Sequence, residues 1–577
     1  MDSEKRLIAA IAISVLILVA FSYLTPDRAP EPGPRPEPVA SDTTPDGPRA
    51  DEPFASAEDE PASAEPGERI EAQAEETIVV DNGVFEVALT NRGGAARGWT
   101  LRDYTTGDGR PLQLLPRHVE EDAPLPLSLA LDDEGLAARL NRSLFRFERS
   151  ALDDPAAPGE RIRFSWSSGD GYAVEKVYEF RRNDYLVGVE VAVTDRGRRL
   201  PARLTVGPGF AAQEPDSTHS NYYYESQASW NVGGRVTRKK RGKLGEHGGF
   251  SGPVHWAGLE DQYFTALILP NDTPATVEWR QRDLAAIAVP TPGEAAAEPE
   301  PRKTPIVAVS IGERGGLLFV GPKRYELMRS IGGDRQLQRA VWFSSQDWLR
   351  VIVKYIFLGL VWIHDHVANN WGLAIILATV VLRLVLFPVN QYSMVSMKKT
   401  QIQMSKLQPK IKAIRNKYKK VKDAQSRQKM NEEMMALYRK EGVNPMGGVS
   451  GCLPLLAQFP ILIGFYNMLT VAVELRGAPF VGWVRDLSQE DPYWILPILM
   501  AVTMFAQQKL AMTKVKDPQQ LQQQRVMLFM PIVFGFICLQ MPSGLVLYWF
   551  VNNVLGMGQQ WLVNRHAGRL EAAAQKA

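Results

Sequence analysis

Long apolar runs separate a short N-terminal segment and a large polar middle from a C-terminal part that is dense in hydrophobic residues. Six runs stand out by length: Leu7–Leu24, Trp371–Asn390, Cys452–Val473, Tyr493–Leu510, Val526–Gln540 and Leu545–Val563. A helix that crosses the hydrocarbon core of a bilayer needs about 20 apolar residues, and shorter runs cross where the bilayer thins. The pattern predicts an α-helical polytopic membrane protein with six spans.

The first run is predicted to be an uncleaved transmembrane anchor at residues 1–25. It follows Lys5 and Arg6, it is longer than the apolar part of a usual signal peptide, and the residues after it, Ser22–Pro26, offer no small-residue cleavage site. The N-terminus is therefore expected in the cytoplasm. A cleaved signal peptide is the alternative.

The polar middle of the chain divides into two segments that differ in composition and pattern. Residues 26–76 are rich in Pro, Glu, Ala and Asp, which bury too little apolar surface to order a chain, so they are predicted to be a disordered linker. From 77 to 345, apolar and polar residues alternate with period two, as in Arg161–Trp166, Ala173–Phe180 and Leu186–Val193. Short alternating runs separated by Gly, Asp and Pro predict a large antiparallel β-sandwich domain.

Charge orients the spans. The net charge of +2 does not indicate a class of binding partner. The segment 393–441, however, carries fourteen Lys and Arg against four Asp and Glu. Basic loops stay in the cytoplasm, so this loop is expected inside and the β domain outside. The loop Glu474–Pro492, with four acids and two bases, suits the outside. An arrangement of six spans with both termini in the cytoplasm, including a tail at 566–577, then agrees with the charge of every loop.

One further apolar stretch, Trp348–Ile363, has to be something other than a span. It contains Arg350 and Lys354, and its uninterrupted apolar part is too short to cross a bilayer. The topology leaves room for a single span between the β domain and the basic loop. Residues 346–368 are therefore predicted to form an amphipathic helix on the outer membrane surface.

The basic loop is predicted to be a helical hairpin at 393–445. Its apolar residues follow a heptad spacing in the first arm: Met404, Leu407, Ile411, Ile414, Tyr418 and Val421. Met430, Met434 and Leu437 give a shorter stripe in the second arm, with Lys422–Ser426 as the turn. A loop that is basic only to fix topology is the alternative, although topology alone requires no heptad seam.

A single charge interrupts the second run, where Arg383 lies between Trp371 and Pro388. Arginine stays charged, and its insertion at mid-span costs about 2.5–3.5 kcal/mol. The other candidate spans contain no Asp or Glu to pair with it. A hydrated, positively charged cavity that opens toward the basic loop is the favoured interpretation, and snorkelling of Arg383 combined with bundle packing is the alternative.

Other chemistry is sparse in this sequence. Cys452 and Cys538 both fall in apolar runs, and the histidines lack metal-ligand spacing, so we predict no disulfide framework, no metal, no cofactor and no enzyme active site. The basic cluster Arg235–Lys243 could bind an anion, but a solvated loop is the preferred interpretation. The uncharged polar residues of the spans are expected to make hydrogen bonds between helices. They are Thr379, Gln458, Asn467, Thr503, Gln507, Asn552, Asn553 and Gln559.

Several motifs in one order resemble the YidC family of membrane protein insertases, in its long Gram-negative form. They are Gln408–Ile411, Met434–Tyr438, Val443–Gly448, Pro454–Pro460, Val473–Arg476, Ala478–Phe480, Asp491–Leu499 and Pro542–Tyr548. The resemblance covers essentially the whole chain, the soluble part by texture more than by motif. It implies a periplasmic β-super-sandwich domain and a five-span core, at 369–565, in the bacterial inner membrane.

The resemblance also implies a site and partners. The groove arginine of the family falls on Arg383, with Thr379 one turn earlier, and the spans that contact substrate contain Gln458, Tyr548 and Trp549. Trp549 stands where a family member can have a second Tyr, so this position offers an aromatic ring without a phenol hydroxyl. The implied partners are nascent membrane proteins, membrane lipids, the Sec translocon, and the ribosome and signal-recognition components at the basic hairpin.

Two other functions remain open at this stage. A transporter or anion channel could use Arg383 as its binding charge, but the chain has no internal repeat and no paired broken helices. The β domain could be a sugar-binding or enzymatic module, but no pair of acids at suitable spacing is apparent in it.

Overall fold

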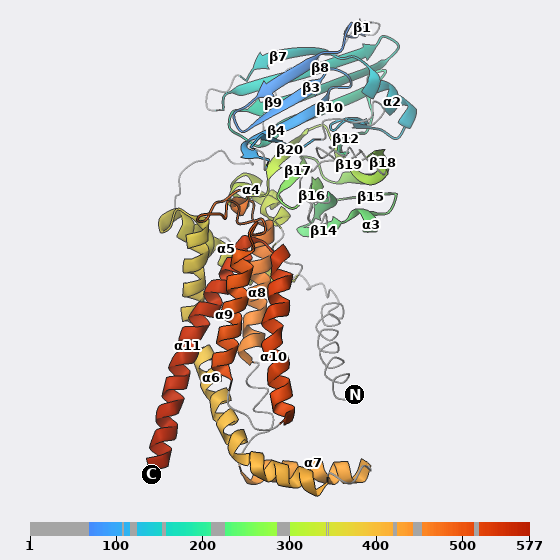
Figure 1. The fold of residues 1–577 in the computed structure, drawn as a ribbon. Helices are drawn as coiled ribbons and strands as arrows, with labels where there is room; N and C mark the ends of the chain where they lie inside the picture. Colours follow the sequence, from blue (N-terminus) through green and yellow to red (C-terminus); the bar gives the residue numbers. More distant parts are fainter. Residues whose placement is uncertain are drawn as a thin grey trace, which may run out of the picture. The chain divides into compact units, whose positions relative to one another are not determined.

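The computed structural model describes residues 68–576, with gaps at 107–108, 116–123, 153–156, 209–225, 286–300, 342, 344–345, 419–423, 442–452 and 513–517. The predicted anchor and most of the predicted linker therefore lie outside the described residues. The described chain contains a β-rich domain followed by a set of long helices (Figure 1).

Among the described residues, the β-rich domain contains three sheets, and neighbouring strands in them are antiparallel. The largest has eleven strands, in the order β1 (Arg69–Ile70), β8 (Gly159–Ser168), β9 (Tyr172–Arg181), β10 (Leu186–Asp195), β20 (Gly316–Pro322), β17 (Phe264–Pro270), β16 (Val254–Glu260), β13 (Gln227–Val232) and β14 (Arg235–Lys239). On this sheet β7 (Arg146–Ala151) pairs with β8 and β11 (Arg198–Arg199) pairs with β10.

Two smaller sheets complete the domain. The five-stranded sheet runs β15 (His247–Gly252), β18 (Ala275–Ala285), β19 (Pro301–Ile311), β12 (Ala202–Val206) and β6 (Leu129–Ala130). The four-stranded sheet runs β2 (Thr77–Asp81), β3 (Phe85–Thr90), β4 (Ala95–Thr105) and β5 (Pro111–Gln113). The antiparallel β architecture predicted from the period-two pattern is confirmed.

Aromatic side chains join these sheets. Phe85 of the four-stranded sheet lies 4.7 Å from Trp99 of the same sheet and 6.3 Å from Phe180 of the large sheet, measured between ring centroids. Trp230 of the large sheet stacks on Trp279 of the five-stranded sheet at 5.1 Å. Both smaller sheets therefore pack against the large sheet, which buries the apolar residue of each alternating pair.

Two predictions for this region were wrong in detail. The sheet begins at β1, inside the segment predicted to be linker, because Arg69 and Ile70 pair with Ser168 and Ser167 of β8. The basic cluster predicted to be a loop is the edge strand β14 followed by the short helix α3 (Arg241–Leu244). The domain also contains α2 (Glu134–Arg142) and, after β20, α4 (Tyr325–Gly332) and two 3-10 turns, Gly333–Arg335 and Leu337–Ala340.

The helical region contains α5 (Asp347–His366), α6 (Trp371–Lys417), α7 (Ala424–Lys440), α8 (Leu453–Val471), α9 (Ile495–Ala511), α10 (Pro518–Ile537) and α11 (Ser543–Lys576). Short 3-10 turns follow α8, at Val473–Leu475, and α10, at Cys538–Gln540. Helix α11 packs against both α6 and α9, α9 also packs against α10, and α8 packs mainly against α5.

Three helices extend further than the sequence predicted. The span at Trp371–Asn390 and the first hairpin arm are one helix, α6, which continues through Pro388. The turn predicted at Lys422–Ser426 overlaps α7, which already begins at Ala424, and α11 continues through most of the predicted tail. Long polar side chains are good helix formers, so a helix does not have to end where its apolar face ends.

Among the described residues, one helical segment is long and apolar enough to cross a membrane, Trp371–Ser396 in α6. Shorter apolar helical segments are Leu462–Val471, Ile495–Ala511 and Gln524–Gln540. The predicted span Leu545–Val563 is not among them, because paired Asn and Gln residues lower its mean hydropathy. The number of spans therefore stays a prediction.

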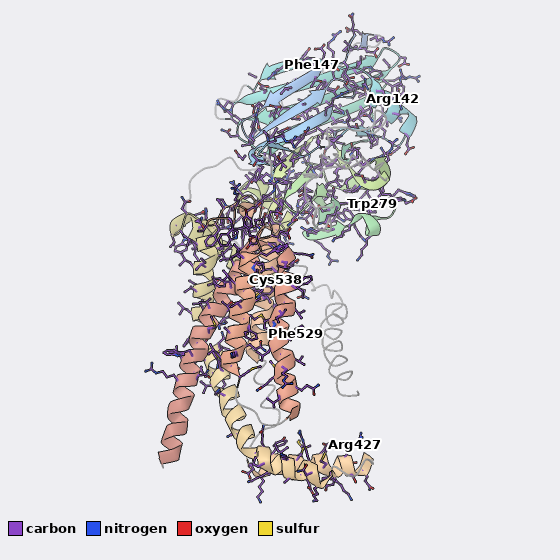
Figure 2. The ribbon with its side chains drawn as sticks, in the orientation of Figure 1. Arg142, Phe147, Trp279, Arg427, Phe529 and Cys538 are labelled. Carbon is purple, nitrogen blue, oxygen red and sulfur yellow. The ribbon has the colours of Figure 1, made fainter. Side chains whose placement is uncertain are left out.

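The helices nevertheless expose apolar side chains. On α10, Phe529, Ile532 and Phe536 have 59%, 59% and 76% of their surface exposed (Figure 2 labels Phe529). Similar residues are exposed on α6 and α9, such as Val385 and Val502. Contiguous exposed apolar surface on a monomer indicates a surface made for lipid or for another protein.

Helix α5 has the two faces expected of an amphipathic helix. Leu349, Val353 and Phe357 recur every four residues and are buried. Trp348 and Tyr355 are exposed on other faces, with more than half of their surface accessible. Its placement on the outer membrane surface stays a prediction.

Candidate functional site

The candidate site is a polar seam between α6, α9 and α11. On α11 the residues Tyr548, Asn552, Gly556 and Gln559 are spaced by four, four and three positions, so they lie along one helix face. Several members of this face contact α6 and α9, as described below. The local sequence alternates these positions with apolar residues such as Val551, which lets one helix offer both a polar and an apolar face.

Arg383 is the centre of this seam. It lies in α6, its Nη1 donates to Asn552 Oδ1 at 3.4 Å, and its Nε is buried without a hydrogen-bond acceptor. Among the residues that the structure describes, no carboxylate lies within salt-bridge distance of this guanidinium. A charged group that is partly desolvated and poorly paired costs folding free energy.

Thr379 lies one turn before Arg383 on α6. Its side chain is 1% exposed, and its hydroxyl donates to the Ile375 carbonyl of the same helix at 2.6 Å. The hydroxyl is thus engaged within its own helix. Thr379 can shape the wall of the seam, and its hydroxyl is a weaker candidate for direct contact with a substrate.

Tyr548 and Trp549 face different neighbours. The ring of Tyr548 is buried and stacks on Phe465 of α8, with centroids 4.3 Å apart and planes 11° from parallel. Trp549 is partly exposed and meets Phe534 of α10 edge to face at 5.3 Å. The two aromatic residues therefore tie α11 to α8 and α10. The side chain of Gln458, the remaining predicted site residue, lies outside the described residues.

Further polar contacts continue the seam. Gln559 Nε2 lies 3.3 Å from the Phe387 carbonyl and 3.3 Å from Gln391 Oε1, while Gln559 Oε1 is buried without a partner. Asn553 Nδ2 donates to the Met500 carbonyl of α9 at 3.4 Å. These residues were predicted only to make hydrogen bonds between helices. The spacing of Tyr548, Asn552, Gly556 and Gln559 by four, four and three positions was the signal that could have placed Gln559 on the same helix face as Tyr548.

Long helices that expose apolar side chains, together with a β-rich domain, are typical of an integral membrane protein that carries a soluble domain. Two sequence families match the chain: the family described as 60Kd inner membrane protein over residues 362–569, and the YidC periplasmic domain over residues 77–358. The chain belongs to the YidC family of membrane protein insertases. It is accordingly an inner membrane protein with a periplasmic β-rich domain.

Similarity to named relatives extends over nearly the full length. The chain is 31% identical over 582 residues to the membrane protein insertase YidC of Syntrophus aciditrophicus, covering 98% of this chain and 100% of that one. It is 32% identical over 590 residues to that of Geobacter sulfurreducens, covering 99% and 100%. Among solved structures, an active YidC insertase with its first transmembrane domain resolved matches at 19% identity with a TM-score of 0.34, covering 85% of this chain and 94% of that one.

Proposed function

We propose that this protein inserts nascent inner-membrane proteins through the polar seam around Arg383. The observation that carries this proposal is the partly buried guanidinium of Arg383, whose Nε is buried without an acceptor. It makes one long hydrogen bond and meets no carboxylate among the described residues. Such a group has unused capacity for an acidic or polar segment of a passing chain. The relatives of this chain are named membrane protein insertases, so the proposed substrate is a nascent membrane protein.

Electrostatics explains how the seam would receive a substrate. Two opposite charges 4 Å apart attract with about 4 kcal/mol at an effective dielectric of 20, against about 1 kcal/mol in water. Arg383 would therefore favour an acidic segment that enters from the cytoplasm. The membrane potential, negative inside, pushes the same acidic segment outward.

The apolar part of the substrate would move along the apolar surfaces of the bundle. The predicted spans Cys452–Val473 and Leu545–Val563 border this route. Transfer of the segment into lipid releases about 25 cal/mol for each Å² of apolar surface removed from water. This gain would drive release, so insertion requires no nucleotide and no cofactor.

The proposed topology has six spans, cytoplasmic termini and a cytoplasmic hairpin. It is supported by the continuity of α6, which links the span containing Arg383 directly to the basic arm. Within the hairpin, Leu407 and Ile411 are buried against Met434, Leu437 and Tyr438. Ion pairs Lys410–Glu441 and Lys417–Glu433, each at 2.5 Å, join the two arms.

The basic hairpin suggests the partners. A folded arm with a surplus of Lys and Arg, such as Arg427 on α7 (Figure 2), suits ribosomal RNA or signal-recognition components, since phosphate backbones attract positive charge. Cooperation with the Sec translocon is part of the same proposal.

Reconstitution tests the proposal against an alternative. Purified protein in liposomes should integrate a small single-span protein that carries an acidic N-terminal tail. An anion channel that used Arg383 as its binding charge would instead conduct or exchange anions and leave the single-span protein outside the bilayer. Anion flux without integration would replace the proposed function with this alternative.

A further inference from the structure

We propose that Gly556 positions the guanidinium of Arg383, and that the absence of a side chain at this position keeps the charge in the seam. This inference rests on the proposed function of Arg383 for its activity readout. Gly556 is a buried residue of α11, one turn after Asn552, which already contacts Arg383.

The space beside Gly556 is filled by two polar side chains. A Cβ atom built on Gly556 would lie 2.8 Å from Arg383 Nη2, and closer still to Gln507 Nε2 of α9. Real Cβ atoms essentially never approach other heavy atoms within 3.0 Å. Three helices thus meet at one glycine, with the ends of two long polar side chains occupying the volume of a methyl group.

The consequence of adding a methyl group is specific. Both atoms in the way are the far ends of flexible side chains, so the side chains can move while the helix backbones stay in place. The guanidinium would leave its position against α11, and its hydrogen bond to Asn552, already 3.4 Å long, would be lost. A Gly556→Ala variant therefore displaces the charge without deleting it.

Helix propensity does not explain why a glycine stands at position 556. Glycine inside a helix is less favourable than alanine by about 1 kcal/mol. Gly558 provides the matched control, because it lies on the same helix, two residues on, and a Cβ built there would meet nothing within 4 Å. The two Gly→Ala changes have the same effect on propensity and differ in what the methyl group contacts.

The experiment is a double-mutant cycle in proteoliposomes with two single-span substrates, one with an acidic translocated tail and one with a neutral tail of equal length. Gly556→Ala should lower insertion of the acidic substrate several-fold, with a smaller effect on the neutral one, and should have no further effect in an Arg383→Ala background. Gly558→Ala should behave like the parent in both backgrounds. Equal loss in the two backgrounds, or unchanged insertion by Gly556→Ala, would overturn the positioning role.

A second measurement separates this inference from the proposed function. If Arg383→Ala inserts both substrates like the parent, the proposed role of the charge fails. The melting temperature of full-length protein in detergent then still tests whether Gly556 positions the side chain of Arg383. Gly556→Ala should lower it less in the Arg383→Ala background than in the parent, because one of the two clashes is gone. Equal shifts in both backgrounds would show that Gly556 does not act on Arg383.

Discussion

At the residue scale, the role of Arg383 could depend only on its positive charge or also on the planar shape of its guanidinium, and substitutions separate the two. A guanidinium has five N–H donors, and within the described part of the chain one of them reaches an acceptor, at 3.4 Å. No bidentate partner would be lost on replacement by lysine. Arg383→Lys should therefore retain much of the insertion activity, whereas Arg383→Ala should impair substrates with acidic translocated segments several-fold more than neutral ones. Matched substrates in proteoliposomes check this, and the melting temperature in detergent serves as the control.

The outcome that contradicts a charge role is equally definite. If Arg383 is a structural anchor, Lys is a poor replacement, because an ammonium cannot reproduce the planar fork of a guanidinium. Both substrates would then lose insertion equally, and the loss would follow a fall in melting temperature.

A second residue-scale prediction concerns a buried lysine in the β domain. Lys176 is fully buried, with its Nζ 2.6 Å from the Gly93 carbonyl and 2.8 Å from the Leu127 carbonyl. Burial lowers the pKa of this lysine from 10.5 to about 7. Between these pH values the unfolded chain holds a proton that the folded chain has released, so the contribution of Lys176 to stability rises from pH 7 to pH 10.

The measurement compares melting temperatures of full-length parent and Lys176→Met between pH 6 and 10. The parent should gain several degrees relative to the variant as the pH rises above 7, since one pKa unit corresponds to about 1.4 kcal/mol. Lys243→Met, at an exposed lysine of α3, is the control and should show no such gain. A constant difference between parent and Lys176→Met across this range would mean that Lys176 has the same protonation state folded and unfolded.

At the scale of elements, the apolar contact between the two arms of the hairpin, α6 and α7, can be broken without changing any residue around Arg383. Ile411 is 6% exposed and packs with Met434, Leu437 and Tyr438. Ile411→Asp would bury a charge there, which costs several kcal/mol unless the arms separate. Crosslinking of a Lys410→Cys, Glu441→Cys pair by a short bis-maleimide should fall several-fold. Lys412→Asp, on the exposed side of α6, should leave crosslinking unchanged, and equal crosslinking in both variants would contradict a packed hairpin.

Elements also show what the sequence could and could not reveal. Period-two alternation identified several strands of the β domain, such as β8, β9 and β10, and the lone charge of Arg383 was visible inside an apolar run. The strand β1 was missed because its evidence is a partner, Ser167 and Ser168 of β8, about 100 positions away. The residue pattern of a short segment cannot identify such a pairing, and in this case the charged residues around Ile70 indicated a linker.

The candidate site was predictable in its chemistry and unpredictable in its contacts. Asn552, Gln507 and Gln559 were visible as polar residues in apolar runs, but which of them meets Arg383 depends on how α9 and α11 rotate about their axes. Gly556 carried no signal of its own, because a residue without a side chain acts through the space that it leaves.

At the scale of the whole molecule, the arrangement across the membrane follows from where positive charge can stay. Moving the fourteen basic residues of segment 393–441 across the bilayer is unfavourable, so the hairpin should face the cytoplasm while the β domain is periplasmic. Two exposed arginines mark these regions, Arg427 on α7 and Arg142 on α2 (Figure 2). Each can be replaced by cysteine and tested with a membrane-impermeant maleimide on intact spheroplasts.

Arg142→Cys should be labelled at once, and Arg427→Cys should be labelled only after the membrane is broken. The parent, whose Cys538 is buried, measures the background from the native thiols in both conditions. Protease added from outside should give the same result, removing the β domain and sparing the hairpin. Labelling of Arg427→Cys in intact spheroplasts would place the basic hairpin in the periplasm. A seam that opens toward the hairpin could then not receive substrates from the cytoplasm, and the proposed route past Arg383 would have to be abandoned.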